Sequence, residues 1–214
     1  MQISPEILPR IIQAIAEIIE KNAEAVTELD LAIGDGDHVI NLQRGIHALQ
    51  AQSTEIAQLD WVAAMQKIGM TLMSTVGGAS GSLYGTLLVT MSKALRAQTV
   101  DLQTFAAAFA QGVESVKLRG KAEAGEKTML DVLIPAAQSL QQSAAAAPPL
   151  QELLAGITHA AETGVEATRN MLATKGRASF LGERSRGHLD AGAKTAQLMI
   201  KAIADVIAAS ATPP

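Results

Sequence analysis

The sequence predicts an all-α fold, a bundle or barrel of about eight helices forming one domain over residues 1–214. Apolar residues recur at helical spacing along most of the chain. No stretch alternates apolar and polar residues, with β-branched enrichment, for long enough to make a convincing strand. Glycine and proline clusters interrupt the helical pattern, and no shift in composition marks a second domain.

The first helix is expected to begin after Ser4-Pro5-Glu6, because proline is tolerated in the first turn of a helix. Its apolar face comprises Leu8, Ile11, Ile12, Ile15, Ile18 and Ile19. The remaining helices are expected around residues 38–51, 59–75, 81–97, 101–118, 127–142, 150–173 and 190–209. Breaks are expected at Gly34/Gly36, Gly77/Gly78, Gly120–Gly125, Pro148-Pro149 and Gly176–Gly187.

Composition excludes several classes of protein. With 214 residues, 48% hydrophobic and 18% charged, the chain suits a soluble globular domain with large buried faces. A net charge of −4 and 2% aromatic residues argue against a nucleic-acid-binding surface. Cysteine is absent, which excludes disulfides and thiolate metal sites. The start of the chain lacks signal-peptide features, and no uncharged apolar run reaches the ~18 residues of a membrane helix, so a cytoplasmic location is expected.

An acidic motif, DLAIGDGDHVIN, runs from Asp30 to Asn41. It places the carboxylates of Asp30, Asp35 and Asp37 close together, with glycines that permit a tight turn. Like charges at this spacing repel unless a cation lies between them, and oxygen ligands suit Mg²⁺. On spacing alone, an equally good interpretation is a solvated acidic turn with Asp37 as the N-cap of the next helix.

A glycine-rich segment, Gly77 to Ser82, lies between two apolar helical stretches. A glycine turn that opens a helix presents free N–H groups and the positive end of the helix dipole, and both attract anions. The segment lacks the lysine of a G-x-x-x-x-G-K-[ST] phosphate loop, and alone it could be an interhelical turn that allows close packing. Together with the acidic motif, it suggests a site for a metal-bound polyphosphate.

A third segment, residues 174–193, reads as a charged, glycine-rich loop, and long loops in compact domains are usually functional. With GDGDH at 34–38, GGASGSLYGT at 77–86, RGKAEAGEKTMLDVLIPA at 119–136 and KGRASFLGERSRGHLDAGA at 175–193, the chain resembles the nucleotide-binding L subunits of dihydroxyacetone kinases. The resemblance implies a closed barrel of about eight antiparallel helices with the nucleotide site at one end. Loops separated by an even number of helices emerge together, so these motifs are expected to converge.

The resemblance also implies roles for individual residues. Asp30, Asp35 and Asp37 match magnesium ligands that hold a pair of Mg²⁺ ions. The positions that match nucleotide-binding residues are His38, Asn41, Ala79, Ser80, Gly120, Met129, Arg177, Asp190, Ala191 and Gly192. No catalytic nucleophile or general base is expected on this chain.

The function implied is phosphoryl transfer to dihydroxyacetone held by a separate K subunit, with this chain supplying nucleotide and Mg²⁺ and inactive alone. In the phosphoenolpyruvate-dependent arrangement, bound ADP is rephosphorylated by a phosphohistidine M subunit. Alternatives are an L subunit of an ATP-dependent kinase for dihydroxyacetone or a related keto-sugar, a nucleotide-loaded adaptor for a transcription regulator, and a structural module with a vestigial site. A homodimer is compatible with each, and neither nucleic acid nor membrane is an expected partner.

The chain departs from the family at a few positions. Val39 stands where glycine is usual, which predicts an altered start of the helix if the backbone there needs positive φ. Ser82 and Ala191 stand where proline is common. His188 is open between a nucleotide contact, a partner contact and a helix cap, while Arg184 and Arg186 are either a solvated rim or a contact for an anionic partner. His47 and His159 are expected to be ordinary helix residues.

Overall fold

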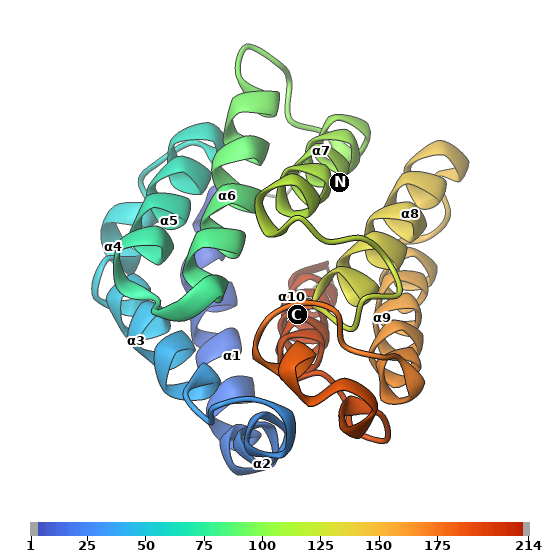
Figure 1. Ribbon diagram of the computed structural model, residues 1–214. Coiled ribbons are helices and arrows are strands. Elements are labelled where there is room, and N and C mark those ends of the chain that lie inside the picture. The colour runs from blue at the N-terminus through green and yellow to red at the C-terminus, as the bar shows by residue number, and fades with distance from the viewer. Residues whose placement is uncertain (1–3, 212–214) are drawn as a thin grey trace.

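The computed structural model describes residues 4–211, and this part of the chain is almost entirely helical, with no strand (Figure 1). The elements are η1 (Pro5–Ile7), α1 (Leu8–Lys21), α2 (Ala23–Ile33), α3 (His38–Ala51), α4 (Ser53–Ile56), α5 (Trp61–Thr75), α6 (Gly78–Leu95), α7 (Leu102–Gly120), α8 (Leu130–Ala146), α9 (Leu150–Ala167), η2 (Thr168–Asn170), η3 (Arg177–Ser185) and α10 (Ala191–Ala211). The all-α prediction is therefore confirmed.

The long helices pack in an order that returns to its start. Helix α1 packs against α3, α3 against α5, and each helix from α5 to α9 packs against the next one along the chain. Helix α10 packs against both α9 and α1, and Figure 1 shows it between them. This arrangement is compatible with the closed bundle that the sequence suggests, with α2 and α4 as additional short helices beside it.

Local sequence signals explain where several helices begin. Asp60 caps α5, because its Oδ1 accepts the Ala63 N–H at 2.8 Å. At the start of α7, Asp101 and Thr104 form a capping box in which each side chain accepts the other's backbone N–H, at 2.8 and 2.9 Å. These contacts satisfy N–H groups that have no partner inside the helix.

Glycines allow two pairs of helices to approach closely. A Cβ at Gly85 of α6 would lie 2.7 Å from the Gly69 carbonyl oxygen of α5. A Cβ at Gly164 of α9 would lie 2.2 Å from the Asp131 carbonyl oxygen of α8. Pro135 lies four residues after Asp131 inside α8 and has no N–H to donate to that carbonyl, so α9 packs on a locally opened helix.

The largest apolar cluster lies mainly among α5 to α10 and also includes Leu42 of α3. Leu95, Leu130, Val132 and Ala193 are among its members and are essentially inaccessible to solvent. Full burial of one such leucine or valine stabilises the fold by roughly 1.5–3 kcal/mol. The start of α10 is thereby anchored in the core next to the motif-bearing loops.

Three sequence expectations about the elements are corrected. Helix α2 was not expected; it directly follows α1 across Asn22, whose Nδ2 donates to the Ile18 carbonyl at 2.7 Å and closes α1. Helix α9 ends at Ala167 rather than near residue 173. The segment expected to be a loop contains η3, which changes direction at Gly182, where φ is 54°.

No helix within residues 4–211 is long and apolar enough to cross a membrane.

Candidate functional site

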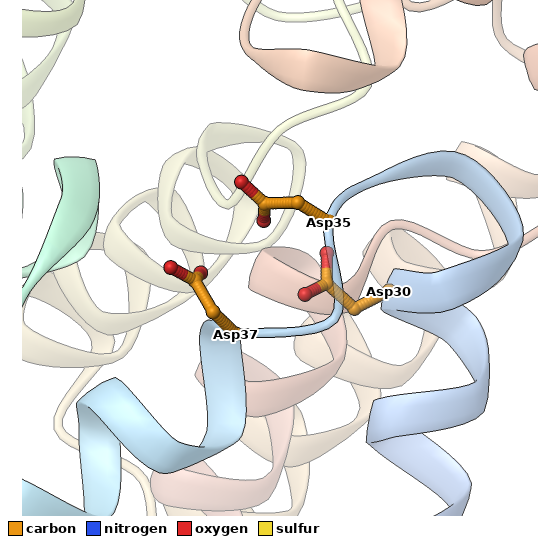
Figure 2. A group of neighbouring side chains, drawn as sticks. All are labelled: Asp30, Asp35 and Asp37. Carbon is orange, nitrogen blue, oxygen red and sulfur yellow. The ribbon is translucent and has the colours of Figure 1, made fainter.

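The acidic motif forms a tight turn between α2 and α3. Asp30, Asp35 and Asp37 each offer a carboxylate oxygen, and these atoms all lie within 4.8 Å of one another. Figure 2 shows the three carboxylates facing the same space beside the turn. Gly36 has φ of +76°, a conformation that favours glycine. The local sequence therefore concentrates negative charge at one point, which suits a divalent cation.

Asp30 is also part of the start of α3. Its Oδ2 accepts the His38 N–H at 3.1 Å, so the carboxylate lies at the positive end of the α3 dipole. Asp37 occupies the N-cap position, but its side chain makes no capping hydrogen bond. Asp37 is thus an exposed carboxylate at the N-cap position with no capping hydrogen bond of its own, and the alternative of a solvated acidic turn stays open on this geometry.

His38 connects three helices through its two ring nitrogens. Nε2 lies 2.9 Å from the Thr195 hydroxyl of α10, and Nδ1 lies 3.3 Å from the Ser80 hydroxyl of α6. Since the Thr195 hydroxyl donates to the Gly192 carbonyl at 3.1 Å, it accepts from Nε2–H, and Nδ1 then accepts from Ser80. Burial lowers the pKa of His38, against the charges of Asp30 and Asp37, which favours this neutral ring.

The glycine turn lies directly against the acidic motif. A Cβ at Gly77 would lie 2.3 Å from Oδ1 of Asn41, so the amide of Asn41 rests on the turn. Gly78, the first residue of α6, has φ of +65°. No side chain caps α6, and the backbone N–H groups of Ala79 and Ser80 lie in its first turn, where helices have unpaired donors. The starts of α3 and α6 thus meet beside the three carboxylates.

The third segment reaches the acidic turn through Arg177. Its Nε lies 3.0 Å from Oδ2 of Asp35, and both side chains are exposed. Near the other end of the segment, a Cβ at Gly192 would lie 3.9 Å from Cβ of Met129. Met129 itself is only 6% exposed, so most of its side chain is covered. Gly120 ends α7, near Leu83 of α6. The predicted convergence of the four motif-bearing loops is therefore confirmed.

Asp190 caps α10, and its pKa is shifted further than that of any other carboxylate in this region. Its Oδ2 accepts the Ala193 N–H at 2.7 Å, and its own N–H donates to the Thr168 hydroxyl at 3.1 Å. Burial raises the pKa of Asp190 to about 6, although the Ala193 hydrogen bond and the charge of Lys127 act in the opposite direction. Asp190 rather than His188 thus provides the cap, and the His188 side chain is exposed.

The departures from the family pattern are accommodated without strain. Val39 is the second residue of α3, has no positive φ, and packs in a buried cluster with Ala191 and Ile46. Whether this helix start differs from that of relatives with glycine at this position stays a prediction. Ser82 accepts from Arg119 Nε at 2.7 Å, which joins the start of α6 to the end of α7.

The arginines of the third segment and the remaining histidines have simpler surroundings. Arg186 forms an ion pair with Glu183 at 2.8 Å and donates to the Asn170 carbonyl, so it has a structural role. Arg184 is exposed. His47 and His159 lie in α3 and α9, as expected.

The structure adds residues near the candidate site that sequence reasoning did not identify. Thr195 holds His38, as described above. Asp131 shapes the 121–129 loop, since its two carboxylate oxygens accept the N–H groups of Gly125 and Thr128 at 2.5 and 2.8 Å. Lys127 lies buried between two loops. These three residues contact backbone atoms or residues far away in the sequence, so the spacing of residue types along the sequence could not predict the contacts.

The fold and the site define an all-α protein with clustered carboxylates beside two helix starts, an arrangement suited to a metal-bound phosphate group. The chain belongs to the DAK2 domain family, whose model matches residues 32–205. It is 42% identical to the "PEP-dependent dihydroxyacetone kinase 1, ADP-binding subunit DhaL" of Listeria innocua, covering 87% of this chain and 89% of that protein. The corresponding Escherichia coli subunit is 40% identical, with 88% and 90% covered.

Solved structures share the fold. The dihydroxyacetone kinase of C. freundii in its native form superposes with a TM-score of 0.72 at 26% identity, covering 92% of this chain. The same kinase solved with AMP-PNP and Mg²⁺ also gives 0.72, at 24% identity. This chain spans about a third of the length of that kinase, 34% and 33% in the two structures.

Proposed function

We propose that this chain is the ADP- and Mg²⁺-binding subunit of a phosphoenolpyruvate-dependent dihydroxyacetone kinase, folded as one domain and located in the cytoplasm. The observation that carries the proposal is the convergence of Asp30, Asp35 and Asp37 within 4.8 Å beside the starts of α3 and α6. The similarity to ADP-binding subunits over nearly their whole length supports it. An independent ATP-dependent L subunit remains the alternative, and the same experiment distinguishes the two.

The residues present fit a magnesium-bound nucleotide. Asp30, Asp35 and Asp37 would hold the metal, proposed as two Mg²⁺ ions, which would neutralise phosphate charge. The N–H groups of Ala79 and Ser80 would receive phosphate oxygens at the start of α6. Arg177, paired with Asp35 in this structure, carries a guanidinium suited to the same anionic group.

The remaining predicted positions would surround the nucleotide. His38 and Asn41 join the acidic turn to the glycine turn. Gly120 at the end of α7 and Met129 before α8 would lie on one side of the nucleotide, and Asp190, Ala191 and Gly192 at the start of α10 on the other.

The proposal places the ketose on a separate K subunit and assigns the recharging of ADP to a phosphohistidine M subunit. Exposed apolar side chains support docking of a partner beside the site: Leu31 is 64% exposed, Ile40 60% and Phe180 85%. Leu31 contacts the acidic turn, Ile40 lies in the first turn of α3, and Phe180 lies in η3 after Arg177.

Reconstitution tests this division of labour. The purified chain is mixed with dihydroxyacetone, the K subunit and the M subunit of the same organism, with phosphoenolpyruvate and the proteins that phosphorylate the M subunit. Turnover is expected only in the complete mixture. Turnover with ATP and the K subunit alone would support the ATP-dependent alternative, whereas turnover by this chain with ATP and no partner would contradict the split site.

A further inference from the structure

Lys127 is the largest completely buried side chain in residues 4–211, with 1% of its surface exposed. It lies in the loop between α7 and α8, with φ of +60°, which is unusual for a residue with a side chain. Burying a cation is strongly unfavourable unless it finds polar partners. A lysine buried in a loop therefore indicates a specific structural or functional role.

The ammonium of Lys127 binds two backbone carbonyls from a distant part of the chain. It donates to the Thr168 carbonyl at 2.5 Å and to the His188 carbonyl. Thr168 follows the last residue of α9, where the helix dipole favours a cation, and His188 precedes the start of α10. One side chain thus fixes both ends of the segment that carries Arg177.

Charged neighbours of Lys127 come from several elements. Asp190 and Asp131 favour the charged ammonium, while Arg169 and Arg186 oppose it. Burial is the largest influence and lowers the pKa of Lys127. The two carbonyl partners together with Asp190 compensate the buried charge.

The predicted nucleotide-binding positions lie on two segments near this lysine. Met129 lies two residues after Lys127 in the same loop. Asp190 lies two residues after His188 and begins the stretch 190–192. The two segments touch where a Cβ at Gly192 would lie 3.9 Å from both Cβ and N of Met129. The distance between these two segments is therefore fixed near the two hydrogen bonds that the Lys127 ammonium donates.

We propose that Lys127 is a positioning residue for nucleotide binding, which holds Met129 in register with residues 190–192 through hydrogen bonds to backbone carbonyls. It acts without contacting the metal cluster at Asp30, Asp35 and Asp37. The inference rests on the proposed nucleotide-binding function, and it assigns Lys127 a part in shaping the candidate nucleotide site.

The absence of cysteine from the sequence allows a selective test. Lys127→Cys is alkylated with 2-bromoethylamine in denaturant, which restores an amine of nearly the original length, and is then refolded. Lys201→Cys, at an exposed site of α10 where lysine pairs with Asp205, receives the same treatment as the matched control. Binding of ADP with Mg²⁺ is measured by calorimetry, and binding of Mn²⁺ alone by electron paramagnetic resonance.

Loss of charge-assisted hydrogen bonds is expected to weaken ADP binding by about 10- to 100-fold in the unmodified Lys127→Cys protein. Alkylation is expected to restore ADP affinity to within about threefold, while Mn²⁺ affinity stays within about threefold throughout because the metal cluster is a separate site. Lys127→Met, produced without refolding, is the second variant and is expected to show the same selective loss of ADP binding.

Three results would overturn the inference. A folded Lys127→Met or Lys127→Cys protein with wild-type ADP affinity would show that no positioning is needed. Equal losses of ADP and Mn²⁺ affinity in both variants would show a role in the fold alone. A wild-type chain that binds Mn²⁺ but no ADP would overturn the proposed nucleotide function together with this inference.

Discussion

A Cβ atom at Gly34 would lie 2.1 Å from Oδ1 of Asp30, closer than any real side chain could approach. The carboxylate of Asp30 therefore occupies its place in the acidic cluster only because residue 34 has no side chain. Gly34 is therefore part of the candidate metal site, although it has no side chain to offer a ligand atom.

Gly34→Ala is expected to displace Asp30 and to weaken Mg²⁺-dependent ADP binding by at least about tenfold, since one carboxylate is lost from the cluster. Calorimetric titration of ADP at saturating Mg²⁺ measures this. Gly156→Ala in α9, where a Cβ would lie 3.3 Å from the Ser139 hydroxyl oxygen, is the control with the same chemical change. Equal ADP affinity in the two variants would show that Asp30 does not hold the metal.

Gly164→Ala is expected to destabilise the fold, because its Cβ would lie 2.2 Å from the Asp131 carbonyl oxygen and α9 would have to move away from α8. The free energy of unfolding should fall by about 1–3 kcal/mol. Gly156→Ala in the same helix should instead change stability little or raise it by up to about 1 kcal/mol through helix propensity. Urea unfolding measures the stability of both variants, and a Gly164→Ala protein as stable as the wild type would show that α8 and α9 are not closely packed at Gly164.

The helices are predictable where apolar spacing is regular and glycine marks the ends. The break at Gly77/Gly78 coincides with the start of α6 at Gly78. Helix α2 was missed because only Val26 and Ile33 of its residues are buried, which leaves no continuous apolar stripe in the sequence. The end of α9 lies beside a long-range contact, the hydrogen bond of Lys127 with the Thr168 carbonyl, which the local sequence does not encode.

The candidate site was predictable in its charged and glycine positions, because clustered acids and tight turns are visible as sequence patterns. Two contacts were not predictable: Asp30 accepts the His38 N–H at the start of α3, and Thr195 holds the His38 ring. Each contact depends on how separate segments of the chain pack. Lys127 lay within a motif used to identify the family, yet its backbone partners could come from any residue type.

Asp190 is expected to make stability depend on pH between about 4 and 6. Its pKa is raised from 3.8 to about 6 by burial, so the native state binds more protons than the unfolded state in this window. The free energy of unfolding should therefore fall as pH rises from about 4 to about 6, by at most about 3 kcal/mol.

Asp190→Asn removes this titration and should flatten the pH dependence of urea unfolding over the same window. Asp205→Asn, on the exposed end of α10, controls for the loss of one negative charge from this part of the fold. A slope that is unchanged in Asp190→Asn would contradict the raised pKa.

Removal of bound metal and nucleotide is expected to lower the melting temperature. A ligand that binds only the native state at ~100 times its dissociation constant stabilises that state by about 2.7 kcal/mol. Differential scanning calorimetry before and after treatment with EDTA and removal of nucleotide measures the shift. Hydrogen exchange in the 121–129 and 171–190 loops should rise first. A melting curve that responds to neither treatment would argue against a resident ligand.

The acidic cluster is proposed to hold nucleotide through Mg²⁺. The most direct test of this proposal is mass spectrometry of the small molecules released on denaturing the chain, after purification without added nucleotide. We expect ADP from the wild-type chain and from Asp205→Ala, and none from Asp37→Ala, which should remain folded by circular dichroism. Retention of nucleotide at unchanged stoichiometry in folded Asp37→Ala, or a wild-type chain that releases no nucleotide, would show that the acidic cluster does not hold a nucleotide through Mg²⁺.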